Sequence, residues 1–215
     1  MTIWKAQTGA SRLRVKLTML MAVLMLSGCN ASMKPQRKAA NIEIQEAVGF
    51  TITEEIHIPE SVRLQYYDAL NFLRFDKLQQ GIAILHQVSA AAPFVTAPHI
   101  DLGVAYHRLG DLESAEKNLL QALELNASHP VAHNELGIVY RKSGRFNEAK
   151  QHYEAAIAIY PGYHHARRNL AILCDLYLGD LNCALAHYEA YMSTVPADAE
   201  ASMWIADLSN RMGNR

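Results

Sequence analysis

The sequence predicts an all-α fold, a solenoid of about four helix-turn-helix repeats that ends in a capping helix. A leucine-glycine pair and a tyrosine recur with a period of 34 residues, as Leu102-Gly103 with Tyr106 and as Leu136-Gly137 with Tyr140. Gly110 and Gly144 follow the two tyrosines by four residues, where a helix must stop and the chain must turn. A period of this length predicts a repeat architecture, in which each unit buries its apolar faces against its neighbours.

The second helix of each unit carries small residues in the same phase. Within residues 130–163 the pattern is complete, and its members are Leu136, Gly137, Tyr140, Ala149, Tyr153, Ala156 and Pro161. This pattern resembles the tetratricopeptide repeat (TPR), which implies antiparallel helix pairs of 34 residues. The preceding unit departs from it with Leu119 at the aromatic position and Ala127 at the proline position. Small residues such as Gly137 and Ala149 let paired helices approach to about 8–10 Å.

The same register divides the chain into four repeats, at residues 62–95, 96–129, 130–163 and 164–198. The first is degenerate, because Asp68 replaces the leucine and Gly81 replaces an alanine. The fourth fits only with one residue inserted at the turn, near Leu178-Gly179, and it places Cys174 at the tyrosine position. Residues 199–215 follow as a capping helix that covers the exposed end of the stack.

The N-terminus predicts a lipoprotein signal peptide over residues 1–28. Four cations and no acidic residue accompany a ten-residue run from Leu17 to Leu26 that is apolar except for Thr18. At 1.5 Å per residue the run is about 15 Å long, half of a hydrocarbon core, so it does not span a membrane. Leu26-Ser27-Gly28-Cys29 resembles the lipobox of bacterial lipoproteins, which implies a diacylglycerol thioether on Cys29. The alternative is an ordinary cleaved signal peptide.

Residues 29–61 lie between this anchor and the repeats. The stretch from Asn30 to Ala40 is polar and basic without periodicity, which predicts a tether from the lipid. Apolar residues then alternate with polar ones before Pro59, and they are Phe50, Ile52, Ile56 and Ile58. This alternation predicts an extended segment, and four apolar side chains favour its docking on the first repeat. The alternative is a loosely packed linker.

Two cysteines, Cys174 and Cys183, remain once Cys29 is lipidated. They lie on either side of Gly179, in the predicted turn of the fourth repeat, and the compartment that a signal peptide leads to is oxidising. Antiparallel helices about 8–10 Å apart are compatible with a disulfide between them. The alternative is two buried free thiols.

The sequence predicts neither an enzyme nor a cofactor. Nucleophile-elbow, phosphate-loop and cysteine-histidine nucleophile patterns are absent from it. His129 with His133, and His164 with His165, are close pairs without an evident third ligand, so no metal site is predicted. Removal of residues 1–28 takes away four cations and changes the formal net charge from −1 to −5, which disfavours nucleic acid as a partner.

The resemblance implies that one face of each first helix lines a concave groove for a partner protein or an extended peptide. Carried onto this chain, that face consists of Arg63, Tyr66, Leu70, Leu73, Arg74, Ala97, Ile100, Val104, His107, Arg108, Val131, Asn134, Ile138, Arg141, Lys142, His165, Arg168, Ile172, Asp175 and Leu176. It holds six cations against one acid, Asp175. A basic groove with an apolar stripe favours an acidic, partly hydrophobic peptide. The alternative is that the cations only solvate an exposed face.

These features favour a membrane-anchored interaction scaffold. The lipobox implies membrane attachment, and Asn30 after Cys29 favours the periplasmic face of the outer membrane, since an aspartate there would favour retention in the inner membrane. Similar lipoproteins include pilotins of type IV pilus secretins, adaptors of peptidoglycan hydrolases and proteins beside envelope energy-transduction systems. The sequence leaves these alternatives open, and the competing class is an envelope metal-binding protein or enzyme.

The lipid anchor gives the first testable prediction. Cys29→Ser is expected to leave the precursor unprocessed or to release the protein from the membrane fraction, because stable anchoring depends on the acyl chains attached at this residue. Cell fractionation and acyl-chain labelling measure both effects. Normal acylation and unchanged fractionation of the variant would disprove the assignment.

Overall fold

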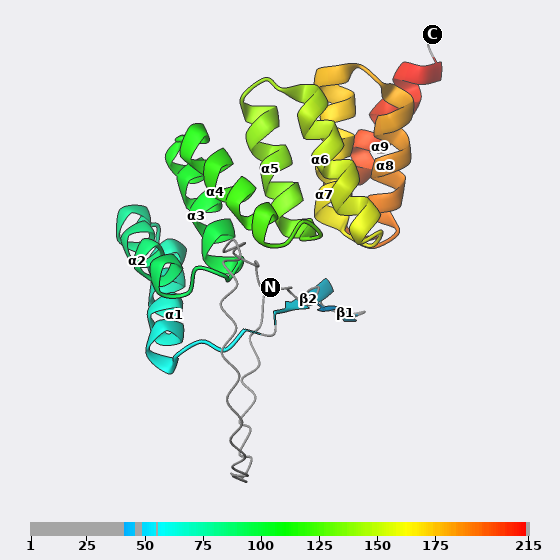
Figure 1. Ribbon diagram of the computed structural model, residues 1–215. Coiled ribbons are helices and arrows are strands. Elements are labelled where there is room, and N and C mark those ends of the chain that lie inside the picture. The colour runs from blue at the N-terminus through cyan, green and yellow to red at the C-terminus, as the bar shows by residue number, and fades with distance from the viewer. Residues whose placement is uncertain (1–40, 46–48, 55, 214–215) are drawn as a thin grey trace, which may run out of the picture.

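The computed structural model describes residues 41–45, 49–54 and 56–213, and the predicted signal peptide, Cys29 and the tether lie outside them. The described chain forms helix pairs that stack in chain order (Figure 1). The four pairs are α1 Glu60–Arg74 with α2 Leu78–Ala91, α3 Ala97–Leu109 with α4 Leu112–Leu125, α5 Pro130–Lys142 with α6 Phe146–Ile159, and α7 His164–Leu173 with α8 Leu181–Met192. The predicted all-α solenoid is therefore confirmed.

Local sequence signals set the helix ends. Gly110 and Gly144 adopt left-handed backbone conformations after α3 and α5, with φ of 83° and 76°, which glycine adopts without steric cost. Asp111 and Asp180 are the N-cap residues of α4 and α8. Their carboxylates accept backbone N–H groups of the first helical turn at 3.0 Å. Pro130 occupies the start of α5, where its missing N–H costs nothing.

Small residues let the two helices of a pair approach closely. A Cβ atom added to Gly137 would lie 2.6 Å from Tyr153 Cε1, and one added to Gly103 would lie 2.5 Å from Leu119 Cγ. Tyr153 and Leu119 are completely buried, so close packing leaves them little room to move. Leu119 therefore occupies the same place in its repeat as Tyr153 in the next. Leucine in place of the aromatic residue gives a smaller side chain, but it still packs against the glycine of the paired helix.

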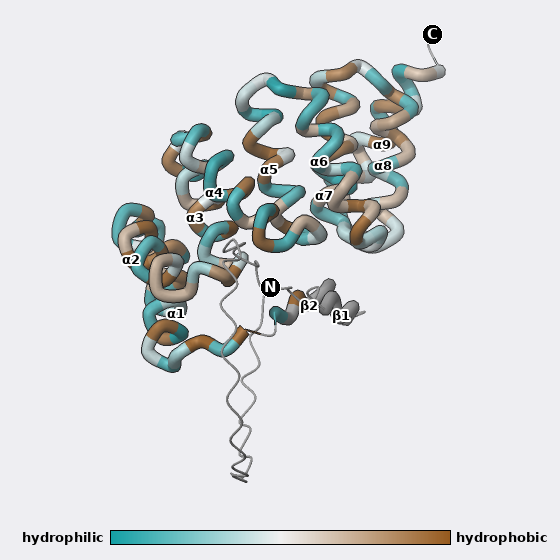
Figure 2. Tube along the Cα trace, in the orientation of Figure 1, coloured by the Kyte–Doolittle hydropathy of each residue, from teal (hydrophilic) through white to brown (hydrophobic). Residues whose placement is uncertain are grey.

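The apolar core continues from one repeat to the next. One cluster of buried side chains extends from α1 to α3 and a second from α3 into the C-terminal helices, while Tyr106 packs against both. Apolar and polar residues accordingly alternate along the helices in Figure 2. Neighbouring repeats thus bury surfaces that a single helix pair leaves exposed.

The fourth repeat contains a π-helical turn, η1 Cys174–Leu178, which continues α7. The sequence placed the extra residue of this repeat at the turn near Leu178-Gly179, whereas the structure places it within the helix. A π-helix closes i→i+5 rings and so takes up one additional residue. Cys174, at the tyrosine position of the repeat, is completely buried there.

Helix α9 Ala199–Gly213 packs on the last repeat, within the range predicted for the capping helix. Ala201 and Leu208 are completely buried, and the centre of the Trp204 ring lies 5.3 Å from that of Tyr188 on α8. α9 thereby covers apolar surface at the end of the stack.

A β-hairpin precedes the first helix pair. Strand β1 Asn41–Gln45 pairs antiparallel with β2 Gly49–Thr53, and Ile42 lies opposite Ile52. The alternating pattern predicted one extended segment reaching Ile58, but the strand ends at Thr53. Residues 41–45 share the polar-apolar alternation and supply a partner strand that was not predicted.

The segment after the hairpin docks on the first repeat, as its four apolar residues predicted. Ile56 and Ile58 pack against the core cluster of α1 and α2. The Glu54 carboxylate accepts hydrogen bonds from Thr96 N–H at 3.1 Å and Thr96 Oγ1 at 2.6 Å, directly before α3. A carboxylate at a helix N-terminus is favourable because it meets the positive end of the helix dipole.

The close crossing in the third repeat gives a stability prediction. Gly137→Ala is expected to destabilise the fold by about 1–3 kcal/mol, because the added atom meets the buried Tyr153 ring. The clash outweighs the helix propensity gained, which is about 1 kcal/mol. Gly213→Ala is the matched control, since no described atom lies within 4 Å of its added Cβ. Circular dichroism melts compare the unfolding midpoints of the two variants. An unchanged midpoint for Gly137→Ala would contradict the close approach of α5 to Tyr153.

Candidate binding face on the first helices

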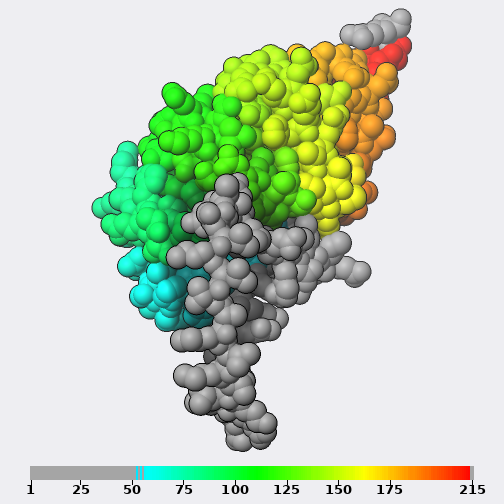
Figure 3. Space-filling view, in the orientation of Figure 1, coloured from blue at the N-terminus to red at the C-terminus, as the bar shows by residue number. Residues whose placement is uncertain are grey.

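The first helices of the repeats, α1, α3, α5 and α7 with η1, form one side of the solenoid. The accessible residues of the predicted groove on these helices are here called the inner face. α5 contacts both α3 and α7 directly. Hydrogen bonds join residues 35 positions apart on neighbouring first helices, from Arg108 Nη1 to Leu73 O and from Asn169 Nδ2 to Asn134 Oδ1, each at 2.9 Å. The stacked repeats therefore form one continuous body (Figure 3).

The structure divides the predicted groove residues into two groups. Tyr66, Leu73, Ala97, Ile100 and Asn134 are buried, because the packing between neighbouring helices covers them, and a partner does not reach their side chains. The accessible members are Arg63, Leu70, Arg74, Val104, His107, Arg108, Val131, Ile138, Arg141, Lys142, His165, Arg168, Ile172, Asp175 and Leu176. The inner face is thus narrower than the groove predicted from the sequence.

Half of the six predicted groove cations are paired with carboxylates. The pairs are Arg63 with Glu60, Arg108 with Asp76 at 2.8 Å, and Arg168 with Glu200 at 3.8 Å. For Arg74, Arg141 and Lys142, no carboxylate lies within ion-pair distance among the described residues. These three keep their positive charge available to a partner.

Two of these cations lie close to His107, where α3 and α5 end. Burial lowers the pKa of His107, and the positive charges of Lys142 and Arg141 lower it further. Arg141 Nε donates to Tyr153 Oη at 3.4 Å, and the guanidinium carbon lies 5.7 Å from the centre of the Tyr177 ring. His107 is therefore uncharged at neutral pH, and Arg141 and Lys142 carry the charge of this region.

Two acidic residues outside the predicted groove set, Asp101 and Glu135, lie beside the inner face. Tyr66 Oη donates to Asp101 Oδ2 at 2.5 Å, and Asn134 Nδ2 donates to Glu135 Oε1 at 3.0 Å. Burial raises the pKa of Asp101 to about 6, against the opposing effect of the Tyr66 hydrogen bond. Burial also raises the pKa of Glu135, and the charge of Asp101 adds to that shift. Their spacing of 34 residues was the sequence signal that could have revealed them.

These acids correct the prediction of a groove with a single acid. Asp101 and Glu135 lie in the first halves of α3 and α5, whereas Arg108, Arg141 and Lys142 lie in the last turns. Positive charge near a helix C-terminus complements the helix dipole, whereas Asp101 and Glu135 lie beyond the first turn, where that effect is weak. The inner face is therefore acidic along one side and basic along the other.

The buried histidines form contacts within the fold. His129 Nδ1 accepts the N–H of Ala132 at 3.3 Å and so caps α5, and His133 Nδ1 lies 2.9 Å from His152 Nδ1. Burial, as the largest cause, lowers the pKa of both His129 and His152 to about 4, so neither carries a proton at neutral pH. Among the described residues, no group of three or more histidine, cysteine or acidic side chains is arranged to hold a metal ion.

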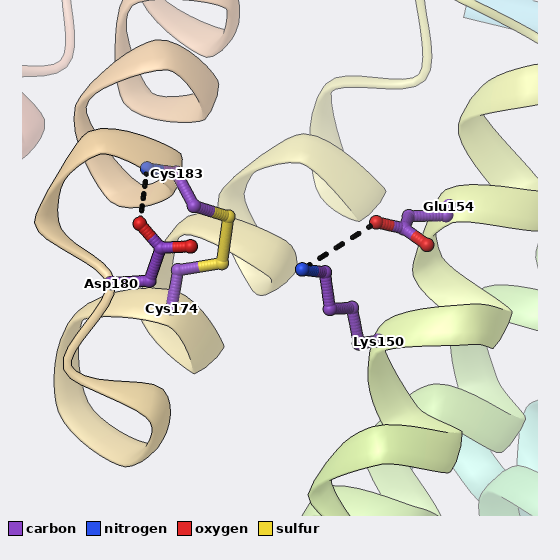
Figure 4. Close-up of a disulfide and its surroundings, with 5 residues drawn as sticks. All are labelled: Lys150, Glu154, Cys174, Asp180 and Cys183. Carbon is purple, nitrogen blue, oxygen red and sulfur yellow. Dashed lines mark hydrogen bonds and ion pairs between the residues drawn. A yellow bond between two sulfur atoms is a disulfide. The ribbon is translucent and has the colours of Figure 1, made fainter.

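A disulfide joins Cys174 of η1 to Cys183 of α8 (Figure 4). The two Cα atoms are 5.8 Å apart, within the common range of about 4.4–6.8 Å. In the same turn, Asp180 accepts the N–H of Cys183 at 3.0 Å. The bond therefore ties the π-helical turn to the following helix.

Two family models match the chain. The model described as tetratricopeptide repeat matches residues 130–163, which are the third predicted repeat from end to end. A model described as TPR repeat matches residues 103–144. Residues 103–163 of the chain therefore match tetratricopeptide repeats. Within the described residues, none of its helices is both long and apolar enough to cross a membrane.

Two curated relatives are much longer than this chain. A peroxisomal targeting signal receptor of Kluyveromyces lactis is 34% identical over 116 residues, and a protein O-mannosyl-transferase of Caenorhabditis elegans is 25% identical over 117 residues. These matches cover 53% and 54% of this chain but 20% and 15% of the relatives. The chain thus spans a fifth or less of either protein.

Several solved structures share the TPR fold. MamA of Desulfovibrio magneticus RS-1 has a TM-score of 0.64 at 18% identity, over 73% of this chain and 88% of that one. PilF of Pseudomonas aeruginosa has a TM-score of 0.66 at 18% identity, over 72% and 70%. The first TPR of Spaghetti (RPAP3), bound to the HSP90 peptide SRMEEVD, has a TM-score of 0.52 at 21% identity, over 56% and 96%. At these identities the likeness shows the fold.

The buried carboxyl of Asp101 gives a pH-dependent prediction. Because its folded pKa is raised, its charge costs stability above about pH 6, and the cost disappears as both folded and unfolded states become protonated near pH 4. Asp101→Asn is therefore expected to stabilise the fold by about 1–3 kcal/mol at pH 8 and by little at pH 4. Urea unfolding at the two pH values measures this difference. Asp68→Asn, on the exposed side of α1, is the control, and an effect independent of pH would contradict the assignment.

Proposed function

We propose that this TPR chain is an interaction scaffold and not an enzyme, and that its inner face binds an extended segment of a partner protein. The observation that carries the proposal is the composition of that face. Arg141 and Lys142 have no carboxylate partner among the described residues. Ile138 precedes them by one turn on α5, and Val104 and Ile172 hold the same repeat position on α3 and α7, all three half-buried. Such a surface offers both charge and apolar contact to a peptide.

The TPR fold supports this proposal. The fold presents an extended surface built from successive repeats, and such surfaces commonly bind proteins. The structurally similar domain of RPAP3 is bound to an HSP90 peptide, SRMEEVD, which contains three acidic residues. For the present chain we propose an acidic, partly hydrophobic segment, because the cations that lack carboxylate partners give the inner face its available charge.

The proposal places the protein on a membrane through a lipid on Cys29. The support comes from the sequence: a cationic start, a short apolar run and a lipobox occur in the order that lipoprotein precursors require. Asn30 supports the periplasmic face of the outer membrane. The partner is then a component of an envelope complex whose assembly the scaffold assists.

A second candidate is a pilotin-type assembly lipoprotein for a type IV pilus secretin. The structural likeness to PilF favours it, since that chain matches over 72% of this one. The two candidates share the inner face and the anchor, and they differ in the identity of the partner.

Site-specific crosslinking in the native envelope tests the proposed function. A photo-crosslinking amino acid at Val104 or Ile138, both on the inner face, is expected to capture one defined partner. The same amino acid at Leu120 or Gln151, exposed on the second helices, is the matched control and should capture little. Capture from the second helices alone would move the binding surface away from the inner face.

A further inference from the structure

We infer that the partner segment binds across the C-terminal ends of α3 and α5 and on η1, at His107, Arg141, Lys142, Leu176 and Tyr177, and that it presents a carboxylate next to a bulky apolar side chain. This inference rests on the proposed function and deepens it. The five residues are here called the junction site.

Charge at the junction site is available because nothing in the described chain neutralises it. Lys142 is exposed, and neither it nor Arg141 has a carboxylate within ion-pair distance among the described residues. Arg108, one helix away, is already bonded to Asp76 and to the carbonyl of Leu73. Arg141 and Lys142 are adjacent in the last turn of α5, and the positive charge of both reaches His107 on α3.

Apolar surface at the junction site comes from the π-helical turn. Leu176 is 69% exposed and Tyr177 is 43% exposed, whereas Val104, Ile138 and Ile172 are only partly exposed. One period earlier, the positions of Leu176 and Tyr177 are occupied by Lys142 and Ser143. The fourth repeat therefore places an exposed apolar pair beside the cations of the third. Large exposed apolar side chains beside charges are typical of protein-binding sites.

The junction site is held in place before a partner arrives. The centre of the Tyr177 ring lies 4.9 Å from that of Phe146, and the Arg141 guanidinium carbon lies 5.7 Å from it. The Cys174–Cys183 disulfide ties the start of η1 to α8, and Gly179 ends η1 in a left-handed conformation. A preorganised site loses less conformational entropy on binding, which favours affinity.

Acidic residues near the junction site limit where the carboxylate of the partner can bind. Asp175, next to Leu176, is paired with Arg211 at 2.8 Å, an arginine that also pairs with Asp207 at 3.1 Å, and the Asp175 side chain is only 9% exposed, so a partner meets little of its charge. Asp101 lies six residues before His107 on α3, which is about 9 Å along the helix axis. A carboxylate of the partner therefore meets attraction over the last turns of α3 and α5, and repulsion nearer Asp101 and Glu135.

A random library of 12-residue peptides displayed on phage provides a defined probe for the mature protein. We expect the wild type to enrich peptides that carry aspartate or glutamate beside leucine, isoleucine, phenylalanine or tryptophan. We expect the affinity for an enriched peptide, measured by fluorescence anisotropy, to fall by about tenfold or more in the double variant Arg141→Gln with Lys142→Gln. We expect a similar loss in the separate variant Leu176→Ala. Lys117→Gln with Lys150→Gln on α4 and α6, and Leu120→Ala on α4, are matched controls and should bind like the wild type.

If the double variant does not fold, Lys142→Gln alone serves as the test. This single change should leave the fold intact, because Lys142 is exposed and has no ion-pair partner in the described chain. Circular dichroism melts verify that each variant is folded. Enriched peptides that bind the junction variants as tightly as the wild type would overturn the inference and leave the proposed function intact. Failure of the wild type to enrich any peptide would contradict the proposed function itself, and the junction site with it.

Discussion

The close approach of two helices at a small residue is the interaction on which the rest of the structure depends. At Gly137 the backbone of α5 lies directly against the Tyr153 ring, and at Gly103 the backbone of α3 lies against Leu119. These crossings fix the distance within each pair, and that distance sets how neighbouring pairs stack. Because a single pair leaves apolar faces exposed, stability depends on stacking, and stacking in turn produces the inner face.

Helix polarity accounts for the cations on that face. All first helices begin along one side and end along the other, so the dipoles of α3 and α5 favour positive charge where these helices end. Asp101 and Glu135 lie past the first turns, and burial raises the pKa of both. A carboxyl group with a raised pKa costs stability when it is charged.

The fourth repeat shows how one inserted residue changes a surface. Its additional residue is taken up as η1, which leaves Leu176 and Tyr177 exposed beside Arg141. The disulfide from Cys174 holds this turn against α8. A local departure from the repeat pattern thus gives one region of the inner face a chemistry that the other repeats lack.

The sequence by itself determined the all-α fold and the repeat register, because a 34-residue period, glycine stops such as Gly110 and small residues at helix crossings are local signals that act within one helix pair. Only the tertiary structure decided which groove residues stay accessible, which cations are neutralised and where the extra residue of the fourth repeat resides. Tyr66 and Asn134 are buried by neighbouring repeats, and Arg108 is paired across α1 and α3. These outcomes depend on contacts between helices about 35 residues apart in sequence, which a pattern read one repeat at a time does not contain.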